Sequence, residues 1–278
     1  MKEWIDYPTW RGGAPAEIAG EIVVHPRLAH LGIERPLLVW LPPSYAGSAG
    51  RYPVLYFQDG QNLFDAQTAF AAPWHLDRAL LARAQRGVEA IAVAIPNGGA
   101  ARIDEYSPFH QRGLGGGRAG EYLRFLLEAV IPCVEASFRV APGPAARGLV
   151  GSSLGGLFAL YGFFERPDLF GRCGAMSPSL QWAHWAPLVY LETRRPQPRG
   201  RLYLDGGARE GSAGRLARWS RGRLPRPYLR GLRRAHAALR ELGYRDGADL
   251  LYVEEAAGEH SEDAWSRRLP GALDFLLR

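Results

Sequence analysis

One stretch, from Leu149 to Leu157, constrains the fold of this chain more than any other part of its sequence. It reads Leu-Val-Gly-Ser-Ser-Leu-Gly-Gly-Leu, so an apolar run ends among small residues and passes at once into the apolar segment 157–164. This pattern predicts a strand that reverses sharply into a helix. Glycines on both sides of Ser153 leave room for a tight turn that exposes its hydroxyl group. Ser153 is therefore the candidate nucleophile.

Length and composition are typical of a globular α/β protein. The chain has 278 residues, of which 47% are hydrophobic and 22% are charged, and a chain of this length can bury a large core. Strand and helix patterns alternate from Tyr52 onwards, which predicts one mostly parallel, doubly wound sheet. The segments 21–25 and 35–41 predict an antiparallel hairpin at its N-terminal edge. Since we find no repeat and no linker, we expect a single domain spanning residues 1–278.

Charge and cysteine content exclude several classes of partner. The net charge of +6 comes almost wholly from arginine, because Lys2 is the only lysine. The arginine-rich run 194–234 lacks the interleaved aromatic residues of a nucleic-acid surface, so we expect no nucleic-acid partner. Cys133 and Cys173 have no metal-ligand spacing, and we expect two buried thiols and no metal site. No segment predicts a signal peptide or a membrane span, which favours a cytoplasmic protein without membrane contact.

A serine hydroxyl becomes a nucleophile when a base takes its proton, and the base needs an anion to orient it. In α/β-hydrolases the acid and then the histidine follow the nucleophile along the chain, each on a loop after a strand. His260 meets this requirement, because it directly follows the last predicted strand, 249–254. His184 precedes every good acid candidate, and His236 lies within the predicted helix 227–243. His260 is therefore the candidate base.

Two carboxylates are candidates for the acid. Asp205 ends the predicted strand 200–205, and Glu210 lies further along the following loop; position alone does not choose between them. An oxyanion hole requires two N–H donors, one from the residue after the nucleophile and one from the loop after the third strand. Leu154 and Gln61 occupy these positions.

The remaining loops have less specific patterns. The segment 100–120 predicts a long irregular loop, and 121–138 predicts a helix kinked near Pro132. Residues 115–120 satisfy the string Gly-x-Gly-x-x-Gly, but no strand directly precedes them, so we expect a flexible loop and no phosphate site. Loop position also suggests four residues for the walls of a substrate pocket: Asn62, Phe64, Tyr106 and Trp182.

Several blocks of the sequence, taken in order, resemble the putative esterase family of α/β-hydrolases, which includes esterase D, feruloyl esterase domains and the enterochelin esterases. The blocks are 52–65, 104–108, 151–156, 177–179, 204–210 and 258–261. The resemblance implies an α/β-hydrolase fold and an acid within a Gly-x-x-Asp or Gly-x-x-Glu segment, which matches residues 207–210. It therefore favours Glu210 as the acid, with Asp205 as the alternative. The arginine-rich segment 211–226 has no counterpart in the family that we can name.

The sequence thus predicts a serine carboxylic-ester hydrolase that uses Ser153, His260 and Glu210, forms an acyl-enzyme and acts on a small-molecule ester. Such chemistry requires neither a metal nor an organic cofactor. Two alternatives stay open at this point: transfer of the acyl group to a sugar or lipid hydroxyl, and a catalytically silent hydrolase fold that acts as a binding module. Short acyl esters, acylated or feruloylated sugars and siderophore lactones all fit the pattern. Nothing in the sequence indicates the oligomeric state.

Overall fold

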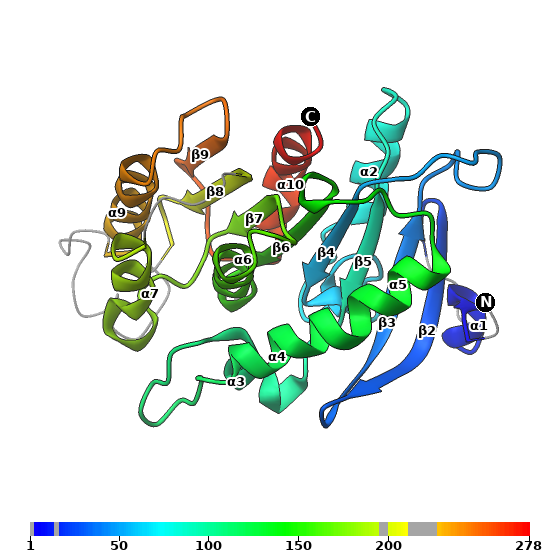
Figure 1. Cartoon of the computed structure of the whole chain (residues 1–278), viewed down its shortest axis with the longest axis horizontal. Coiled ribbons are helices and arrows are strands. Elements are labelled where there is room, and N and C mark those ends of the chain that lie inside the picture. The colour runs from blue at the N-terminus through cyan, green and yellow to red at the C-terminus, as the bar shows by residue number, and fades with distance from the viewer. Residues whose placement is uncertain (1–2, 14–16, 195–199, 211–226) are drawn as a thin grey trace.

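The computed structural model describes residues 3–13, 17–194, 200–210 and 227–278 (Figure 1). The arginine-rich segment 211–226 lies outside the described residues. A nine-stranded sheet of order β1-β2-β3-β5-β4-β6-β7-β8-β9 runs through the described part. That the chain forms a single domain stays a prediction. No helix in the described ranges is long and apolar enough to cross a membrane.

The sheet is mostly parallel, as predicted. Neighbouring strands are parallel from β5 through β4, β6, β7 and β8 to β9. The N-terminal strands form the predicted antiparallel part, in which β2 pairs with β3, and β3 pairs antiparallel with β5. The strands are β1 (Ile5–Asp6), β2 (Glu21–His30), β3 (Ile33–Leu41), β4 (Val54–Gln58), β5 (Ile91–Ile95), β6 (Arg147–Ser152), β7 (Arg172–Met176), β8 (Arg201–Gly207) and β9 (Leu250–Glu255).

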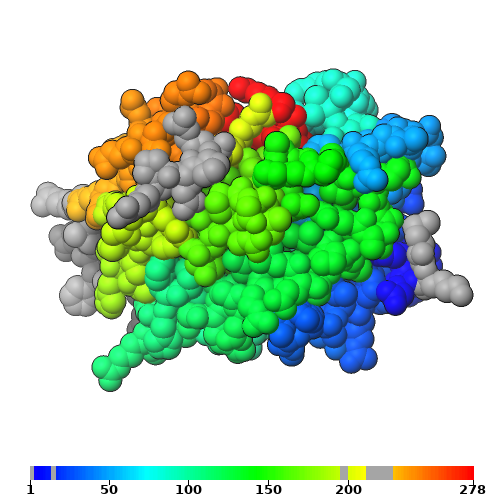
Figure 2. All heavy atoms as spheres, in the orientation of Figure 1, coloured from blue at the N-terminus to red at the C-terminus, as the bar shows by residue number. Residues whose placement is uncertain are grey.

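Helices cover both faces of this sheet. The helices are α1 (Tyr7–Trp10), α2 (Leu76–Ala84), α3 (Arg102–Tyr106), α4 (Ala119–Phe125), α5 (Ile131–Ser137), α6 (Leu154–Glu165), α7 (Trp182–Glu192), α9 (Pro227–Glu241) and α10 (Glu262–Leu276). Helices α3 to α7 and α9 pack into one hydrophobic core, and α1, α2 and α10 pack into a second core. In the space-filling view of the same orientation, green atoms from the middle of the chain occupy the centre of the visible face (Figure 2).

Successive residues of the central strands enter opposite cores. On β4, Val54 and Tyr56 belong to the core of α3 to α7 and α9, whereas Leu55 and Phe57 belong to the core of α1, α2 and α10. All four side chains are fully buried. Strands that are buried on both faces have continuous apolar sequences, which is the pattern that this segment shows.

The structure corrects three local predictions. Residues 102–106 of the predicted loop 100–120 form α3, which is too short to produce a recognisable helical period. The predicted kinked helix 121–138 consists of α4, a π-helical turn at Leu126–Val130, and α5. Pro132 is the second residue of α5, and proline cannot donate the backbone hydrogen bond of a regular helix. Cys173 is buried as expected, but Cys133 is only partly buried.

Two phenylalanines test this assignment of the core. Phe158 of α6 is fully buried, and its ring centroid lies 4.8 Å from that of Tyr122, whereas Phe70 is 87% exposed. Since removing a buried ring leaves a cavity, Phe158→Ala should lower the free energy of unfolding by about 3 to 5 kcal/mol. Phe70→Ala should change it by less than about 0.5 kcal/mol. Equal effects of the two changes on urea unfolding would contradict the packing described here.

Candidate active site

The turn between β6 and α6 has the geometry that the sequence predicts. Ser153 lies between the two elements with φ 55° and ψ −122°, a backbone conformation that residues other than glycine rarely adopt. A Cβ atom on Gly151 would lie 2.5 Å from the backbone carbonyl carbon of Gly155. The strand and the helix therefore approach one another as closely as only glycine allows. The Ser153 N–H donates to the carbonyl of Met176 on β7 (3.0 Å), which holds the turn against the neighbouring strand.

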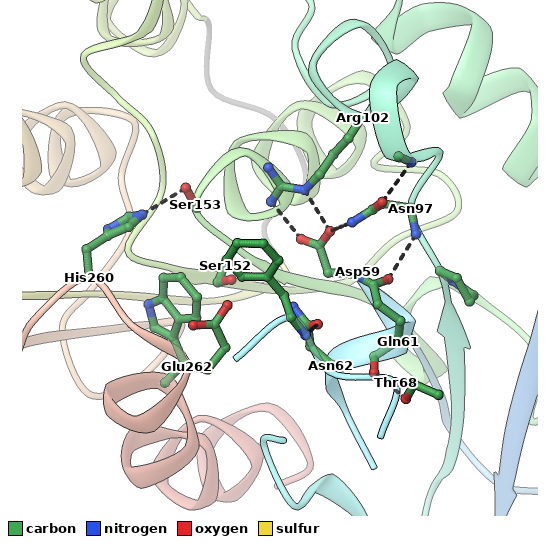
Figure 3. A pocket seen from close by; sticks show the side chains of 14 residues that line it. Asp59, Gln61, Asn62, Thr68, Asn97, Arg102, Ser152, Ser153, His260 and Glu262 are labelled. Carbon is green, nitrogen blue, oxygen red and sulfur yellow. Dashed lines mark hydrogen bonds and ion pairs between the residues drawn. The ribbon is translucent and has the colours of Figure 1, made fainter. Parts of the chain in front are cut away.

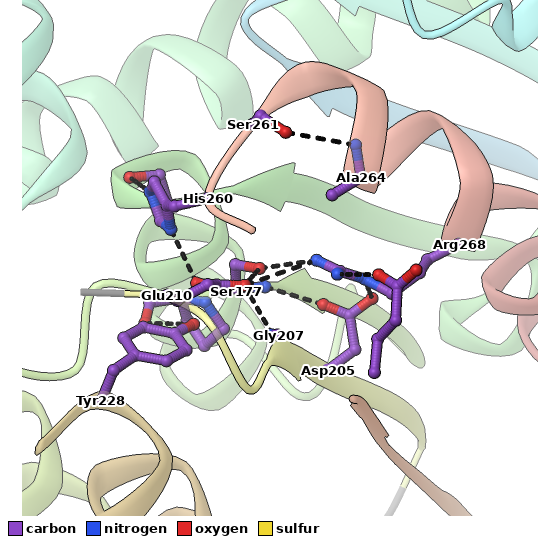
Figure 4. A network of polar contacts seen from close by, with 12 residues as sticks. Ser177, Asp205, Gly207, Glu210, Tyr228, His260, Ser261, Ala264 and Arg268 are labelled. Atoms are coloured by element: carbon purple, nitrogen blue, oxygen red, sulfur yellow. Dashed lines mark hydrogen bonds and ion pairs between the residues drawn. The ribbon is translucent and has the colours of Figure 1, made fainter. Parts of the chain in front are cut away.

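Three side chains from separate loops form a continuous chain of hydrogen bonds. The Nε2 atom of His260 lies 2.8 Å from Ser153 Oγ (Figure 3), and its Nδ1 atom lies 2.7 Å from Glu210 Oε2 (Figure 4). An ionised carboxylate can only accept, so Nδ1 carries the proton that it donates to Glu210. Nε2 is then free to accept the proton of the Ser153 hydroxyl.

Two aromatic rings pack against the imidazole of His260. The ring of Trp265 meets that of His260 edge-on at 5.0 Å, and Tyr228 does so at 6.1 Å. Burial raises the pKa of the Tyr228 phenol well above its ordinary value, and the nearby carboxylates Glu210 and Asp205 act in the same direction. Tyr228 is therefore a neutral wall and does not compete for the proton of His260.

The two acid candidates have different partners. Glu210 Oε1 accepts from Ser177 Oγ and from the Gly207 N–H, each at 2.6 Å, so Oε2 faces His260. Asp205 instead accepts from Arg268 Nε (2.8 Å), from the Tyr203 hydroxyl (2.8 Å) and from the Ser177 N–H (2.9 Å). The alternative acid of the sequence analysis is thus occupied by other donors, and it is Glu210 that contacts His260.

Asp205 and Arg268 form a buried ion pair behind Glu210. Their side chains are 0% and 5% exposed. Burial raises the pKa of Asp205, although the charge of Arg268 and the hydrogen bonds to this carboxylate oppose that effect. Asp205, which lies within β8, is therefore held in this ion pair and does not contact the imidazole.

A cavity of about 650 Å³ opens beside Ser153 and His260 (Figure 3). Its lining residues are Asp59, Gln61, Asn62, Thr68, Phe70, Pro96, Asn97, Gly99, Arg102, Ser152, Ser153, His260, Glu262 and Trp265. They follow β4, β5, β6 and β9, so the cavity lies at the carboxyl edge of the sheet, where open α/β sheets place their ligands.

The loop that carries Gln61 is held from two directions (Figure 3). Arg102 donates from Nε and Nη2 to the two carboxylate oxygens of Asp59, both at 2.7 Å. The Asn97 side chain donates to Asp59 (2.6 Å), and its backbone N–H donates to the side chain of Gln61 (3.1 Å). Burial acts to lower the pKa of Arg102, but the hydrogen bonds and charge of Asp59 raise it. Gln61, in the 3₁₀ turn η1 (Gly60–Asn62), is therefore fixed beside the cavity.

Only one of the four suggested pocket-wall residues lines this cavity, and that residue is Asn62. Phe64 is 3% exposed and packs in the core of α1, α2 and α10. Tyr106 is fully buried, and its hydroxyl accepts the Asp59 N–H (3.0 Å). Trp182 begins α7, where its indole N–H donates to the Phe109 carbonyl (2.8 Å). These three residues therefore lie outside the lining of this cavity, because a loop position does not determine which way a side chain points.

Comparison with known proteins assigns the family. The model of the family described as "Putative esterase" matches residues 29–276. The chain belongs to this esterase family. It is a carboxylic-ester hydrolase, and its α/β-hydrolase fold is that of the solved esterases which it resembles.

Several individual proteins are similar to this chain. The uncharacterized protein YbbA of Bacillus subtilis is 28% identical over 253 residues, which cover 89% of this chain and 94% of YbbA. A siderophore triacetylfusarinine C esterase of Aspergillus fumigatus is 35% identical over 156 residues, covering 52% of each chain. The solved siderophore hydrolase EstA from Aspergillus nidulans has a TM-score of 0.74 at 22% identity, covering 95% of this chain and 97% of EstA.

Sequence reasoning missed several polar residues of the site. Asn97 and Arg102 hold Asp59 in the loop that carries Gln61, and Ser179 Oγ lies 3.2 Å from Ser153 Oγ. Asn97 and Ser179 each follow the end of a strand, so the pattern that singled out Gln61 could have singled them out as well. Arg268 has no such signal, because it lies in the interior of α10. Among the described residues, no group of three or more His, Cys, Asp or Glu side chains could hold a metal ion.

The tight turn predicts contrasting effects for two glycines. Gly151→Ala would force the backbone of β6 and α6 apart, so it should lower the free energy of unfolding by about 3 kcal/mol or more and abolish esterase activity. Gly271 is the control, because it lies within α10 and an added Cβ would meet nothing within 4 Å. Gly271→Ala should raise stability by about 0.5 to 1 kcal/mol with unchanged activity. Chemical denaturation of both variants checks this, and a fully stable Gly151→Ala enzyme would refute it.

Proposed function

We propose that the chain is a serine hydrolase of small-molecule carboxylic esters, and that Ser153, His260 and Glu210 are its catalytic triad. The observation that carries the proposal is the unbroken sequence of contacts from Glu210 through His260 to Ser153 beside an open cavity. The conformation of Ser153 supports it, because strained backbone of this kind at a strand-to-helix turn presents a nucleophile to substrate.

Acylation follows from the proposed roles. His260 Nε2 takes the hydroxyl proton of Ser153 while Oγ forms a bond to the ester carbonyl carbon. The carbonyl oxygen becomes an oxyanion, which the N–H groups of Leu154 and Gln61 stabilise. Leu154 is the first residue of α6, where amide hydrogens have no partner within the helix. The carbon–oxygen bond to the alcohol then breaks, and the alcohol leaves with the proton from His260.

Deacylation repeats these steps with water. His260 takes a proton from the water molecule, whose oxygen attacks the acyl carbon, and the bond to Ser153 Oγ breaks as that oxygen recovers the proton. Glu210 remains ionised throughout and stabilises the imidazolium that forms in each step. Hydrolysis in this scheme uses only the substrate, water and residues of this chain.

Siderophore esters are the first substrate class to test. Two partly matching relatives are a siderophore triacetylfusarinine C esterase and a siderophore enterobactin esterase, 35% and 38% identical over 52% and 38% of this chain. The cavity, about 650 Å³, is large enough to enclose the reacting ester of such a molecule. A panel of siderophore lactones, feruloyl esters, acetylated sugars and p-nitrophenyl esters would define the class. Adding alcohol acceptors separates hydrolysis from acyl transfer by the products formed.

Ser153→Ala provides the direct test of the nucleophile. Without the Oγ atom no acyl-enzyme can form, so kcat for the best ester should fall by a factor on the order of 10⁴ or more. A serine-reactive phosphonate should label the folded wild-type protein at Ser153, as read by peptide mass spectrometry, and should leave the variant unlabelled. Labelling at another residue, or full turnover by the variant, would overturn the proposal.

The acid is tested by a pair of isosteric changes. Glu210→Gln removes the charge that stabilises the imidazolium, so kcat should fall by about 10³-fold to 10⁴-fold. Asp205→Asn leaves the contact between Glu210 and His260 in place but breaks a buried ion pair. It should therefore lower the free energy of unfolding by about 3 kcal/mol or more. Its loss of kcat should be at least about tenfold smaller than the loss in Glu210→Gln. The reverse ranking in kcat would make Asp205 the acid.

A further inference from the structure

A cluster of polar side chains behind the triad has no place in the mechanism given above. Arg268 of α10 donates from Nη2 to Ser177 Oγ (2.7 Å), from Nε to Asp205 (2.8 Å) and from Nη1 to Glu255 (2.7 Å), as Figure 4 shows in part. Ser177, the first residue after β7, is fully buried, and Arg268 is 7% exposed. We propose that Arg268 and Ser177 are positioning residues that fix Glu210 for catalysis, an inference that rests on the triad proposed above.

The direction of each hydrogen bond in this cluster is determined by its chemistry. A guanidinium group can only donate, so Ser177 Oγ accepts from Arg268. An ionised carboxylate can only accept, so the Ser177 hydroxyl proton points to Glu210 Oε1, 2.6 Å away. Arg268 therefore sets the orientation of the Ser177 hydroxyl, and this hydroxyl in turn holds one oxygen of Glu210.

Holding one oxygen of Glu210 directs the other towards His260. Oε1 receives both the Ser177 hydroxyl and the Gly207 N–H, and Oε2 meets His260 Nδ1 at 2.7 Å. A glutamate side chain has several rotatable bonds, and a small misplacement of a catalytic group can lower the rate about 100-fold. The two donors on Oε1 remove that freedom before substrate binds.

Arg268 also keeps two buried carboxylates in place. The charged groups that face its guanidinium are Asp205 of β8, Glu255 at the end of β9, and Glu210, whose Oε1 lies 3.7 Å from Nη2. Like charges buried close together oppose one another, and a cation between them offsets that repulsion. The planar guanidinium reaches Asp205, Ser177 and Glu255 at once, a geometry that a lysine ammonium does not reproduce.

A double-mutant cycle separates positioning from general structural support. Arg268→Met should lower kcat about 10-fold to 100-fold, and Ser177→Ala about 10-fold, with KM within about twofold of the wild type. Because the Ser177 hydroxyl is oriented by Arg268, it should contribute little once Arg268 is removed. The double variant should therefore lose no more kcat than Arg268→Met alone, rather than the product of the two losses. Arg267→Met is the matched control: it also removes an arginine bound to Glu255, but from the exposed side of α10. It should leave kcat unchanged.

Titration with the serine-reactive phosphonate gives the active fraction of each sample, so kcat is expressed per reactive Ser153 and partial misfolding is removed from the comparison. If Arg268→Met does not fold, Arg268→Lys replaces it, with the same expected loss because lysine lacks the guanidinium fork. Multiplicative losses, or wild-type kcat in Ser177→Ala, would overturn this inference. If Glu210→Gln loses activity while Ser177→Ala keeps the kcat of the wild type, the positioning roles of Arg268 and Ser177 are refuted but the proposed triad is not. A Glu210→Gln variant with the kcat of the wild type would refute the proposed triad.

Discussion

The alignment of four parallel strands, β6, β7, β8 and β9, determines where the polar groups of the site can meet. These strands are neighbours in the sheet, and their carboxyl ends lie at one edge. Ser153 follows β6, Ser177 follows β7, Glu210 follows β8 and His260 follows β9. Each side chain therefore needs only a short loop to reach its partner, although the chain separates Ser153 from His260 by 107 positions. Strands β6, β7 and β8 are almost entirely buried, and this packing makes their end of the sheet rigid.

Burial of Glu210 makes the position of His260 well defined but requires compensation. The Glu210 side chain is 0% exposed, and an ionised carboxylate removed from water is costly unless donors and positive charge surround it. The Ser177 hydroxyl, the Gly207 N–H and the nearby Arg268 supply them. Water cannot compete for the oxygen that meets His260, so the imidazole keeps one tautomer and one orientation. One of these compensating groups, Arg268, does not line the cavity.

Sequence patterns predicted the parts of this structure that depend on neighbouring residues or on chain order. The turn at Ser153 follows from local glycine spacing, and His260 follows from its place after the last strand. Position did not show whether Glu210 or Asp205 contacts His260, because that depends on how the donors Ser177, which follows β7, and Arg268 of α10 hold the two carboxylates. Phe64 and Tyr106 were assigned to the pocket wall because they lie on loops at the correct edge, yet their side chains point into the cores. Arg268 had no signal, since only the packing of α10 against β8 brings it to Glu210.

The first turn of α6 links Ser153 to the loop of Gln61. A Cβ atom on Gly155 would lie 3.1 Å from Gln58 Cβ and 3.2 Å from Asp59 Oδ2, so the helix packs directly against the residues that precede η1. Asp59 has a left-handed backbone (φ 55°), and Arg102 and Asn97 hold its carboxylate. A shift of this loop away from α6, or a change in the backbone conformation of Asp59, would therefore break these contacts. The proposed oxyanion donors, the N–H groups of Leu154 and Gln61, are thus oriented before substrate binds, so no energy would be needed to reorganise them as negative charge develops on the substrate.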